Sequence, residues 1–187
     1  MSESALRNGT LPAKKMSNET SPKPRRSRWR SIAIELLLLI VVVTVIRLWQ
    51  QRDMVNGAAP ALQGVTLAGQ HYTLPARPER PVLVHFWATW CPVCRAEQGS
   101  ISAIARDTEV ISVAMQSGKA EEVAGYVKEK GIDFAVLNDA DGSISAAWGV
   151  HAVPASFIVA PDGQIQFVEV GYTTEIGIRL RLWWAGR

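Results

Sequence analysis

The chain has 187 residues with a formal net charge of +3, and 48% of its residues are hydrophobic. This length fits one ordinary domain together with extra segments. The positive charge belongs to residues 1–30, which carry eight Lys/Arg against two Glu, whereas residues 51–187 carry eleven Lys/Arg against fourteen Asp/Glu. The folded part is therefore slightly acidic, and we expect no nucleic-acid partner.

The N-terminal part of the chain has the pattern of a membrane anchor. Residues 1–30 are rich in Ser, Asn, Pro and charge, which predicts a disordered basic tail. Residues 31–49 form a nearly uninterrupted apolar run that is long enough to span a bilayer if Glu35 lies near the headgroups, and Trp29 and Trp49 bracket it. The positive flank places the tail in the cytoplasm. A cleaved signal peptide is the alternative, but the long basic region and the length of the span favour a signal anchor and exclude a cytoplasmic enzyme.

The rest of the chain alternates strand and helix patterns. Residues 50–60 are interpreted as a tether and residues 61–187 as the folded domain. Apolar periodicity and turn residues predict a hairpin over 65–74, a buried strand over 82–88 and a helix over 92–107. Next come a strand over 110–115, a helix over 120–130, a strand over 134–137 and a helix over 143–148. The chain ends with a hairpin of strands 155–159 and 164–170 and a final helix, which Thr173 or Thr174 caps and which runs to Trp184. This order predicts an α/β fold whose central mixed sheet has helices on both faces and an antiparallel edge. Trp183 and Trp184 either touch the membrane interface or belong to a helix face packed on the sheet, and the second interpretation is preferred.

Both cysteines of the chain, Cys91 and Cys94, stand between a buried strand and a helix. At the start of a helix, unsatisfied backbone N–H groups and the positive end of the dipole favour the thiolate of Cys91. Two thiols at this spacing are suited to dithiol–disulfide exchange. A soft-metal site is the main alternative. A purely structural disulfide is disfavoured, because a bond across two residues constrains little chain entropy.

Three features of the chain belong together: the element order, the motif Trp90-Cys91-Pro92-Val93-Cys94, and the pair Val153-Pro154 before the late hairpin. With these features the chain resembles the thioredoxin superfamily over roughly residues 60–185. The N-terminal hairpin and the residues around the cysteines are similar to its TlpA/ResA/DsbE branch, membrane-tethered extracytoplasmic oxidoreductases of bacteria. Within this branch the chain is most similar to the tethered member of the suppressor-of-copper-sensitivity set. The resemblance implies a thioredoxin-like fold with an N-terminal β-hairpin extension, preceded by one transmembrane helix.

The same resemblance implies roles for individual residues. Cys91 becomes the attacking nucleophile and Cys94 the buried resolving thiol. Val153-Pro154 becomes a cis peptide that faces the cysteines, where backbone groups of Val153 pair with a substrate strand. Trp90 is expected both to pack and to shield the thiolate. The Cys91–Cys94 disulfide is then the redox group, and no other cofactor and no metal are expected.

Two further residues are candidates for a proton relay. His85 lies six residues before Cys91, where thioredoxins have a buried Asp and this branch often has Asn. It either exchanges a proton with Cys94 or is an ordinary core histidine, and the second interpretation is preferred. Glu97 follows Cys94 by three residues and is either a solvated surface charge or a local proton acceptor. The solvated charge is preferred here as well.

These inferences predict a single-pass protein of the bacterial inner membrane with its catalytic domain in the periplasm. We expect a thiol–disulfide oxidoreductase that acts on protein thiols and disulfides, with apocytochrome c haem-site thiols, copper-damaged disulfides and thioredoxin-like proteins left open as substrates. Pro92-Val93 lacks the histidine of strong oxidants, and the tether keeps the domain near a DsbD-like membrane electron donor, so a reductase or isomerase is favoured. The alternative is a Cu(I)-binding or copper-delivery module, for which the body offers only Met54 and Met115 as thioethers.

Overall fold

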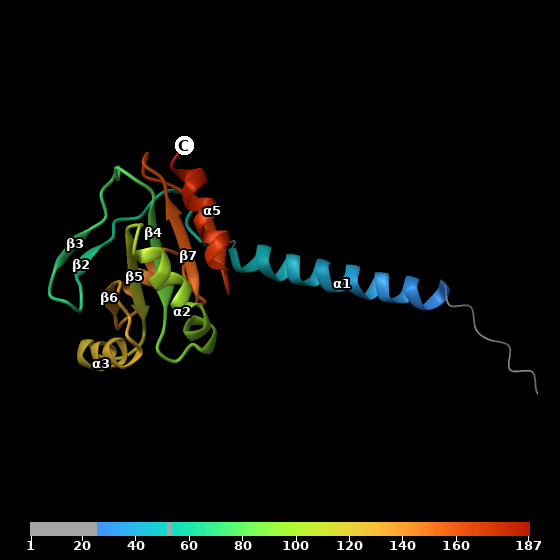
Figure 1. Cartoon of the computed structure of the whole chain (residues 1–187), viewed down its shortest axis with the longest axis horizontal. Helices are drawn as coiled ribbons and strands as arrows, with labels where there is room; N and C mark the ends of the chain where they lie inside the picture. Colours follow the sequence, from blue (N-terminus) through green and yellow to red (C-terminus); the bar gives the residue numbers. More distant parts are fainter. Residues whose placement is uncertain (1–25, 52–53) are drawn as a thin grey trace, which may run out of the picture. The chain divides into compact units, whose positions relative to one another are not determined.

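The computed structural model describes residues 26–51 and 54–187 (Figure 1). These residues fall into two compact units that divide between Val41 and Val42. Helix α1 spans Arg26–Gln51 and so begins inside the segment expected to be a disordered tail. The remainder of that expectation, residues 1–25, lies outside the described residues. Among the described residues, no helix has both the length and the apolar character needed to cross a membrane, so the span expected over residues 31–49 is not confirmed.

A six-stranded mixed sheet forms the centre of the folded body. Its order is β1-β8-β7-β4-β5-β6, in which β4, β5 and β6 run parallel and β7, β8 and β1 are added in antiparallel pairs. The strands are β1 Gly57–Ala58, β4 Val82–Trp87, β5 Val110–Met115, β6 Ala135–Asp139, β7 Ala155–Val159 and β8 Gln164–Val170. The predicted central mixed sheet and its antiparallel edge are therefore confirmed.

The N-terminal hairpin is a separate two-stranded sheet of β2, Gln63–Val65, and β3, His71–Thr73. After β2, Thr66 forms an isolated bridge with Leu137 of β6, and the N–H of Leu67 donates to the carbonyl of Val136 at 2.9 Å. The hairpin extension thus lies along β6, at the edge of the main sheet (Figure 1). Covering part of an edge strand in this way removes free backbone groups that would otherwise invite pairing with another chain.

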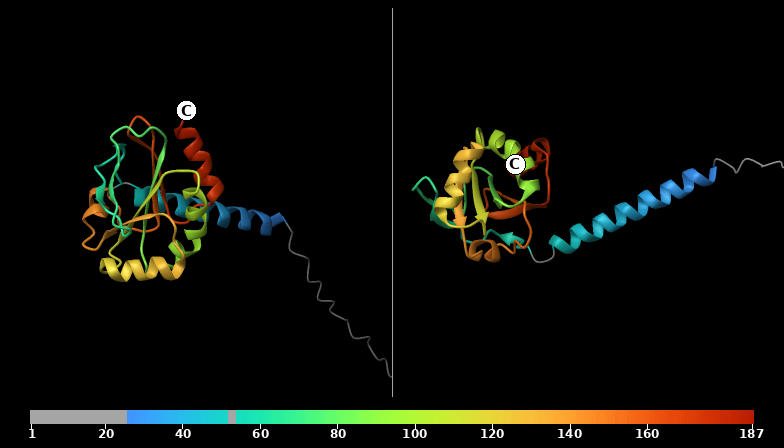
Figure 2. Two further views of the ribbon diagram at one scale, coloured as in Figure 1. Left: turned by 60° about the vertical axis from the view of Figure 1, so that its left-hand side comes forward. Right: turned by 90° about the horizontal axis from the view of Figure 1, so that it is seen from below.

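Helices cover both faces of the sheet (Figures 1 and 2). They are α2 Pro92–Ala105, α3 Ala120–Lys130, α4 Ser143–Ala147 and α5 Glu175–Ala185. Because successive strand residues point to opposite faces, Leu83 and Trp87 of β4 pack with α2, α3 and α5, whereas Val84 and Phe86 pack with α4. Every residue of β4 is buried, as its continuous apolar pattern predicts.

The α4 face contains an aromatic cluster of three buried rings, Phe86, Trp148 and Phe157. Phe157 meets the other two edge-on, with ring centroids 5.6 Å from Phe86 and 5.0 Å from Trp148. Edge-to-face geometry is the favoured arrangement for aromatic pairs. The cluster fixes α4 against β4 and β7 on the face opposite to the cysteines.

Two expectations about the ends of the body are wrong. Residues 57–58, expected in the tether, form β1 and pair with β8, and Met54 is buried in the core. Trp183 and Trp184, expected to face the sheet, are 54% and 64% exposed, because α5 packs through Ile178, Leu182 and Ala185 instead. A local sequence pattern does not indicate that a two-residue segment will pair with the edge of a sheet. It also does not indicate which face a helix buries when apolar residues lie on all sides of that helix.

We predict that Gly163→Ala destabilises the fold more than Gly69→Ala does. Both glycines have positive φ, +81° and +78°, and such a conformation costs an L-residue about 1–2 kcal/mol. At Gly163 the added Cβ would also collide with the carbonyl oxygen of Ala76, whereas at Gly69 it would meet no atom within 4 Å. We therefore expect losses of about 3 kcal/mol and about 1 kcal/mol in the unfolding free energy. Urea unfolding of both variants tests this, and equal losses would contradict it.

Candidate active site

Cys91 and Cys94 form a disulfide where β4 ends and α2 begins. Cys91 is the N-cap of α2 in an extended conformation, and Pro92 occupies the first helical position, where its missing N–H group has no cost. The N–H of Cys94 donates to Sγ of Cys91 at 3.1 Å. The predicted position of the first cysteine at an open helix N-terminus is therefore confirmed.

The sequence predicted a cis peptide facing this pair, and the Val153–Pro154 bond is cis. Sγ of Cys91 lies 3.7 Å from the carbonyl oxygen of Val153, so the two predicted elements are in contact although 62 residues separate them. Cys91 and Cys94 are 3% and 4% exposed. Cys94 is therefore buried, as the resemblance implies, and in the disulfide form Cys91 is buried as well.

Trp90 lies at the surface with 59% of its area exposed, so it belongs to the rim of the site and not to the core. Its Nε1–H donates to the carbonyl of Gln116 at 3.2 Å, and the N–H of Thr89 donates to Oγ of Ser117 at 3.0 Å. Gln116 and Ser117 follow β5, and Gln116 has a φ of +43°, which is uncommon for a residue other than glycine. Sequence reasoning missed these two residues. The one indication in the sequence was that β4 and β5 were expected to be neighbouring strands, because the loops that follow neighbouring parallel strands lie at the same edge of a sheet.

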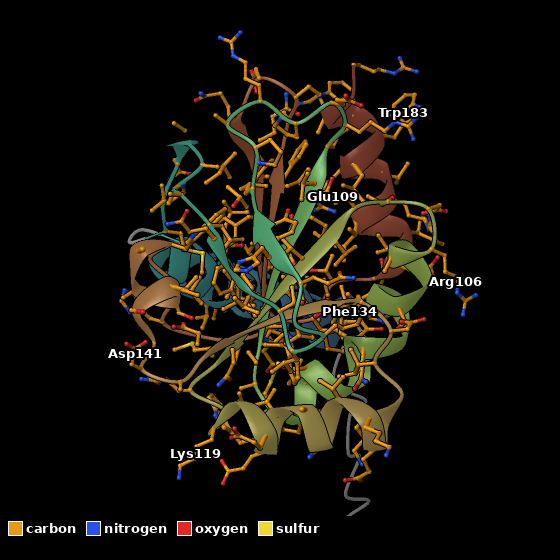
Figure 3. All side chains as sticks on the ribbon, turned by 90° about the vertical axis from the view of Figure 1, so that its left-hand side faces the viewer. Arg106, Glu109, Lys119, Phe134, Asp141 and Trp183 are labelled. Carbon is orange, nitrogen blue, oxygen red and sulfur yellow. A yellow bond between two sulfur atoms is a disulfide. The ribbon has the colours of Figure 1, made fainter. Side chains whose placement is uncertain are left out.

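His85 is 2% exposed and lies on the same face of β4 as the cysteines. Its Nδ1 is 2.9 Å from Oγ of Ser156, a partner that sequence reasoning missed. Burial lowers the pKa of His85 from 6.5 to about 4, so the imidazole is neutral near pH 7. A cavity of about 10 Å³ is lined by His85 and Cys94, and Phe134, labelled in Figure 3, closes part of it. This volume is near the lower limit for one water molecule.

Strand register places four polar side chains in one row across the sheet. His85 of β4 lies opposite Ser112 of β5 on one side and Ser156 of β7 on the other, and Ser156 lies opposite Glu169 of β8. Ser112 already donates to the carbonyl of Ala135 at 2.9 Å and accepts from Nε1–H of Trp87 at 3.1 Å. Ser156 is therefore the hydroxyl that orients the imidazole.

Glu97 is only 1% exposed, so its preferred interpretation as a solvated surface charge is wrong. Its Oε1 accepts the N–H of Thr173 at 3.1 Å, and its Oε2 is buried without a hydrogen-bond partner in the described part of the chain. Burial and the nearby charge of Glu169 raise the pKa of Glu97 from 4.5 to about 7, against the opposing effect of the Thr173 hydrogen bond. The segment between β8 and α5 folds over α2 and covers the carboxyl group, which no local pattern in α2 indicates.

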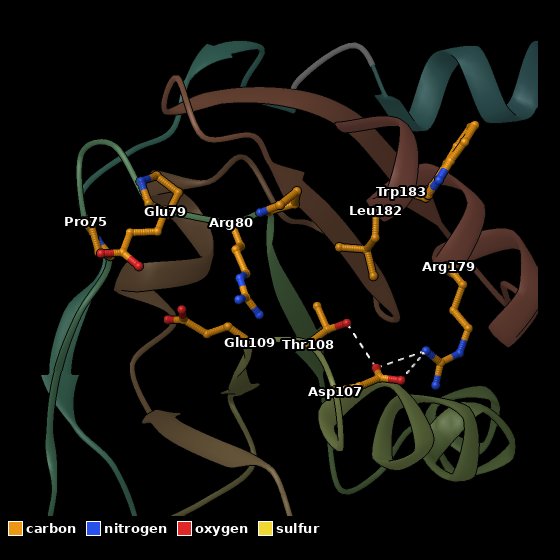
Figure 4. Close-up of a pocket in the computed structure, with 11 residues that line it drawn as sticks. Pro75, Glu79, Arg80, Asp107, Thr108, Glu109, Arg179, Leu182 and Trp183 are labelled. Carbon is orange, nitrogen blue, oxygen red and sulfur yellow. Dashed lines mark hydrogen bonds and ion pairs between the residues drawn. The ribbon is translucent and has the colours of Figure 1, made fainter. Parts of the chain in front are cut away.

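A separate open pocket of about 730 Å³ lies at the other end of the sheet (Figure 4). The loop Pro75–Pro81, the turn 107–109 and the last turns of α5 line it. Arg179 holds one wall through two hydrogen bonds to Asp107, at 2.9 and 2.8 Å. None of the site residues predicted from the sequence lines this pocket, so the candidate chemistry is confined to the cysteine end.

We predict that Glu169→Gln lowers the pKa of Glu97. The charge of Glu169 favours the protonated form of Glu97, and its removal also leaves Arg181, which pairs with Glu169 at 2.6 Å, free to favour the carboxylate. Carboxyl-carbon NMR titration of Glu97 measures the effect. Glu109→Gln, at the far end of the sheet, is the matched control and should leave the titration unchanged. An unaltered Glu97 titration in Glu169→Gln would contradict this account.

Comparisons with known proteins place this geometry in a family. The chain is 28% identical over 154 residues to a thioredoxin-like protein of Haemophilus influenzae, covering 81% of this chain and 92% of that protein. It is 26% identical over 160 residues to the thiol:disulfide interchange protein DsbE of Escherichia coli K12, covering 76% and 86%. A crystal structure of a thiol:disulfide interchange protein of the thioredoxin family from Chlorobium tepidum superposes with a TM-score of 0.60 at 25% identity, covering 71% of this chain and 98% of that one. The Redoxin family model matches residues 54–178, and the chain therefore belongs to the Redoxin family, with a thioredoxin-like fold.

Proposed function

We propose that this chain is a membrane-anchored thiol–disulfide oxidoreductase that exchanges disulfides with protein partners outside the cytoplasm. The observation that carries the proposal is the hydrogen bond from the N–H of Cys94 to Sγ of Cys91 in the first turn of α2. This donor and the positive end of the helix dipole favour the thiolate of Cys91 once the disulfide is reduced. The interchange activity in the name of the Escherichia coli relative supports the same function.

The reaction begins from the reduced pair. The Cys91 thiolate attacks one sulfur of a partner disulfide, a bond forms between Cys91 and that sulfur, and the other partner sulfur leaves as a thiolate. Cys94 then loses its proton and attacks Sγ of Cys91, which re-forms the Cys91–Cys94 disulfide and releases the second partner thiolate. The partner gains two electrons and the pair loses two. This exchange uses the cysteine pair as its redox group and needs no further cofactor.

The surface next to Cys91 suits an extended segment of a partner protein. The carbonyl of Val153, 3.7 Å from Sγ of Cys91, marks where a partner backbone would lie when its sulfur reaches Cys91. Pro154 is buried beneath it, and its own carbonyl accepts the N–H of Gly171 at 2.8 Å. Trp90, exposed beside Cys91, offers apolar area to the same partner. We propose strand-like pairing at Val153 as the mode of recognition.

His85 and Glu97 serve the proton transfer at Cys94 in this proposal. Neutral His85, with Nδ1 held by Ser156, leaves its other ring nitrogen to exchange a proton with Cys94 through one water molecule in the shared cavity. Glu97 lies one helical turn after Cys94, and its pKa of about 7 lets it hold or release a proton near neutrality. His85 is the preferred relay, because it shares a cavity with Cys94.

The sequence supports a tethered arrangement in the bacterial inner membrane. In this proposal residues 1–30 are a cytoplasmic tail, residues 31–49 the anchor and residues 61–187 the periplasmic catalytic domain. The side chains of α1 from Ile32 to Val45 that are described are all exposed, and most are large and apolar. A segment of this composition, flanked by the basic residues of the tail, partitions into a bilayer with the tail inside.

We favour a reductase or isomerase over an oxidant. Pro92 and Val93 place no histidine between the cysteines, and a tether keeps the domain near a membrane electron donor of the DsbD type, which would return two electrons to the pair after each turnover. Haem-site thiols of apocytochrome c and disulfides formed under copper stress are the substrate classes that the resemblance to the TlpA/ResA/DsbE branch implies.

Copper binding by the same thiolates is the weaker candidate. The thioethers that would complete a Cu(I) site, Met54 and Met115, pack with the core on the opposite face of the sheet from the cysteines. In the described ranges, His, Cys, Asp and Glu also form no group of three or more suited to a metal ion. The pair would have to bind Cu(I) alone, so exchange is preferred.

The first test is to trap thiols in growing cells with an alkylating reagent and to separate the proteins without reduction. We expect wild-type Cys91 and Cys94 mostly alkylated, because a donor keeps them reduced in a compartment that otherwise oxidises thiols. Cys94→Ser should accumulate mixed disulfides through Cys91, and the matched Cys91→Ser variant should not. A mostly oxidised wild-type pair would overturn the reductase assignment. A lack of mixed disulfides in Cys94→Ser would overturn disulfide exchange itself.

A second prediction concerns His85→Asn. Without the imidazole, Cys94 must lose its proton to solvent, so resolution of a preformed mixed disulfide should slow on the order of 10²-fold near pH 7 and recover at alkaline pH. Single-turnover kinetics across pH measure this shift of the rate profile. His71→Asn, at an exposed position of the hairpin, is the control and should keep the wild-type profile. A His85→Asn profile that matches wild type would exclude the relay.

A further inference from the structure

The hydroxyl of Ser156 contacts the buried imidazole of His85. All five residues of β7 are buried, and Ser156 is the polar one among them. A buried hydroxyl needs a hydrogen-bond partner, and Oγ of Ser156 lies 2.9 Å from Nδ1 of His85. Ser156 stands opposite His85 in the antiparallel pair of β7 and β4, so a slip of one residue would put Ala155 or Phe157 in its place. The sheet register therefore fixes this contact.

The position of one hydrogen on the imidazole decides what His85 can do. Burial lowers the pKa of His85 from 6.5 to about 4, so near pH 7 the ring is neutral and carries one hydrogen, on Nδ1 or on Nε2. A hydrogen on Nδ1 leaves Nε2 with a lone pair that can accept the proton of Cys94. A hydrogen on Nε2 blocks that transfer. The direction of the hydrogen bond between His85 and Ser156 thus determines whether the ring can act as a base.

Glu169 lies on the far side of Ser156 from the imidazole. β8 places it opposite Ser156, and the Cβ atoms of such cross-strand neighbours are about 5 Å apart. Its side chain is 16% exposed and is held by Arg181, whose Nε lies 2.6 Å from Oε1. In a poorly solvated site, a hydroxyl between a carboxylate and an imidazole turns its hydrogen towards the negative charge and its lone pairs towards the ring. Oγ of Ser156 is then the acceptor and Nδ1–H of His85 the donor.

The neighbour on the other side of His85 does not compete for the ring. Ser112 of β5 also lies opposite His85, but its hydroxyl donates to the carbonyl of Ala135 and accepts Nε1–H of Trp87. The ionisable side chains that line the small cavity together with His85 are Cys94, Arg95 and Tyr126. In the described part of the chain, none of these three is hydrogen-bonded to the imidazole, so Ser156 is the group that holds the ring.

We propose that Ser156 and Glu169 are positioning residues that keep His85 in the Nδ1–H form, so that Nε2 accepts the proton of Cys94. This inference rests on the proposed function and names two residues that serve its proton transfer. The Cys94 thiol loses its proton to Nε2 through one water molecule, and the thiolate attacks Sγ of Cys91. The bond between Cys91 and the partner sulfur breaks, and that sulfur leaves with the electron pair and takes the proton from the imidazolium. His85 returns to the neutral Nδ1–H form.

Nitrogen NMR of the full chain in detergent micelles, labelled with ¹⁵N at histidine, tests the tautomer in the disulfide form. Correlations to the carbon-bound ring hydrogens distinguish a nitrogen that carries hydrogen from one that does not, and His85→Asn assigns the signal among the three histidines. We expect the Nδ1–H form in the wild type and in Ser156→Thr, which keeps the hydroxyl. Ser156→Ala and Glu169→Gln should move His85 to the Nε2–H form. Ser112→Ala, on the other side of the ring, is the matched control and should keep Nδ1–H.

The rate at which a preformed mixed disulfide is resolved shows whether Ser156 acts through His85. Ser156→Ala should slow this step on the order of 10-fold near pH 7, which is less than the effect of His85→Asn. In a His85→Asn background, the same substitution should change the rate by less than about twofold, because the two residues act as one unit. An equal slowing in both backgrounds would assign Ser156 a purely structural role and overturn the proposal.

The spectra and the rates separate this proposal from the function on which it rests. A wild-type His85 in the Nε2–H form, or a tautomer that Ser156→Ala leaves unchanged, overturns the proposal and leaves disulfide exchange intact. A wild-type rate profile in His85→Asn overturns the proposal together with the relay, even where the ring has the Nδ1–H form. Mixed disulfides trapped in Cys94→Ser test the exchange itself, and their absence would not alter the histidine spectra.

Discussion

The burial of β4 on both faces is the constraint on which the rest of the structure depends. β4 lies between β5 and β7 at the centre of the sheet, and all six of its residues are buried. A strand in this position can move only together with the core, so the start of the turn that follows Trp87 is held in place. That turn places Cys91 at the N-cap of α2, where the first N–H groups of the helix have no intrahelical partner. The chemistry of the cysteine thus depends on the rigidity of the strand before it.

The same burial sets the protonation of the two titratable groups near the cysteines, in opposite senses. The pKa of His85 falls from 6.5 to about 4, and that of Glu97 rises from 4.5 to about 7. Between pH 4.5 and 6.5, folding therefore releases a proton at His85 and takes one up at Glu97. As the pH rises through this interval, the unfolding free energy gains from His85 and loses from Glu97, so the two contributions oppose each other. Both groups are neutral where the pair is buried, which avoids placing a net charge under the disulfide.

The two ends of the sheet differ in the surfaces that they offer. At the cysteine end, the Val153–Pro154 peptide, Trp90 and the loop after β5 form the surface proposed for a protein partner. At the other end, the chain enters through β1 and the last turn of α5 carries exposed tryptophans. One helix connects the ends, since α5 begins beside Glu97 and finishes at Trp184. This arrangement separates the surface proposed for exchange from the open pocket at the other end of the sheet.

Apart from β1, every helix and strand of the domain could be predicted from the amino-acid sequence, including the hairpin extension and the position of Cys91 at a helix start. The contact of Val153-Pro154 with the cysteines was predicted through resemblance to a known superfamily. These features depend on local apolar periodicity, on turn residues and on motif spacing, which are all visible along the chain. Four features depend on the folded chain: Glu97 is buried under Thr173, Ser156 holds His85, Gln116 holds Trp90, and α5 turns its tryptophans outward. The physical reason is that burial and hydrogen-bond partners come from elements more than 25 residues away, and no pattern within one helix or strand records which neighbour will cover it.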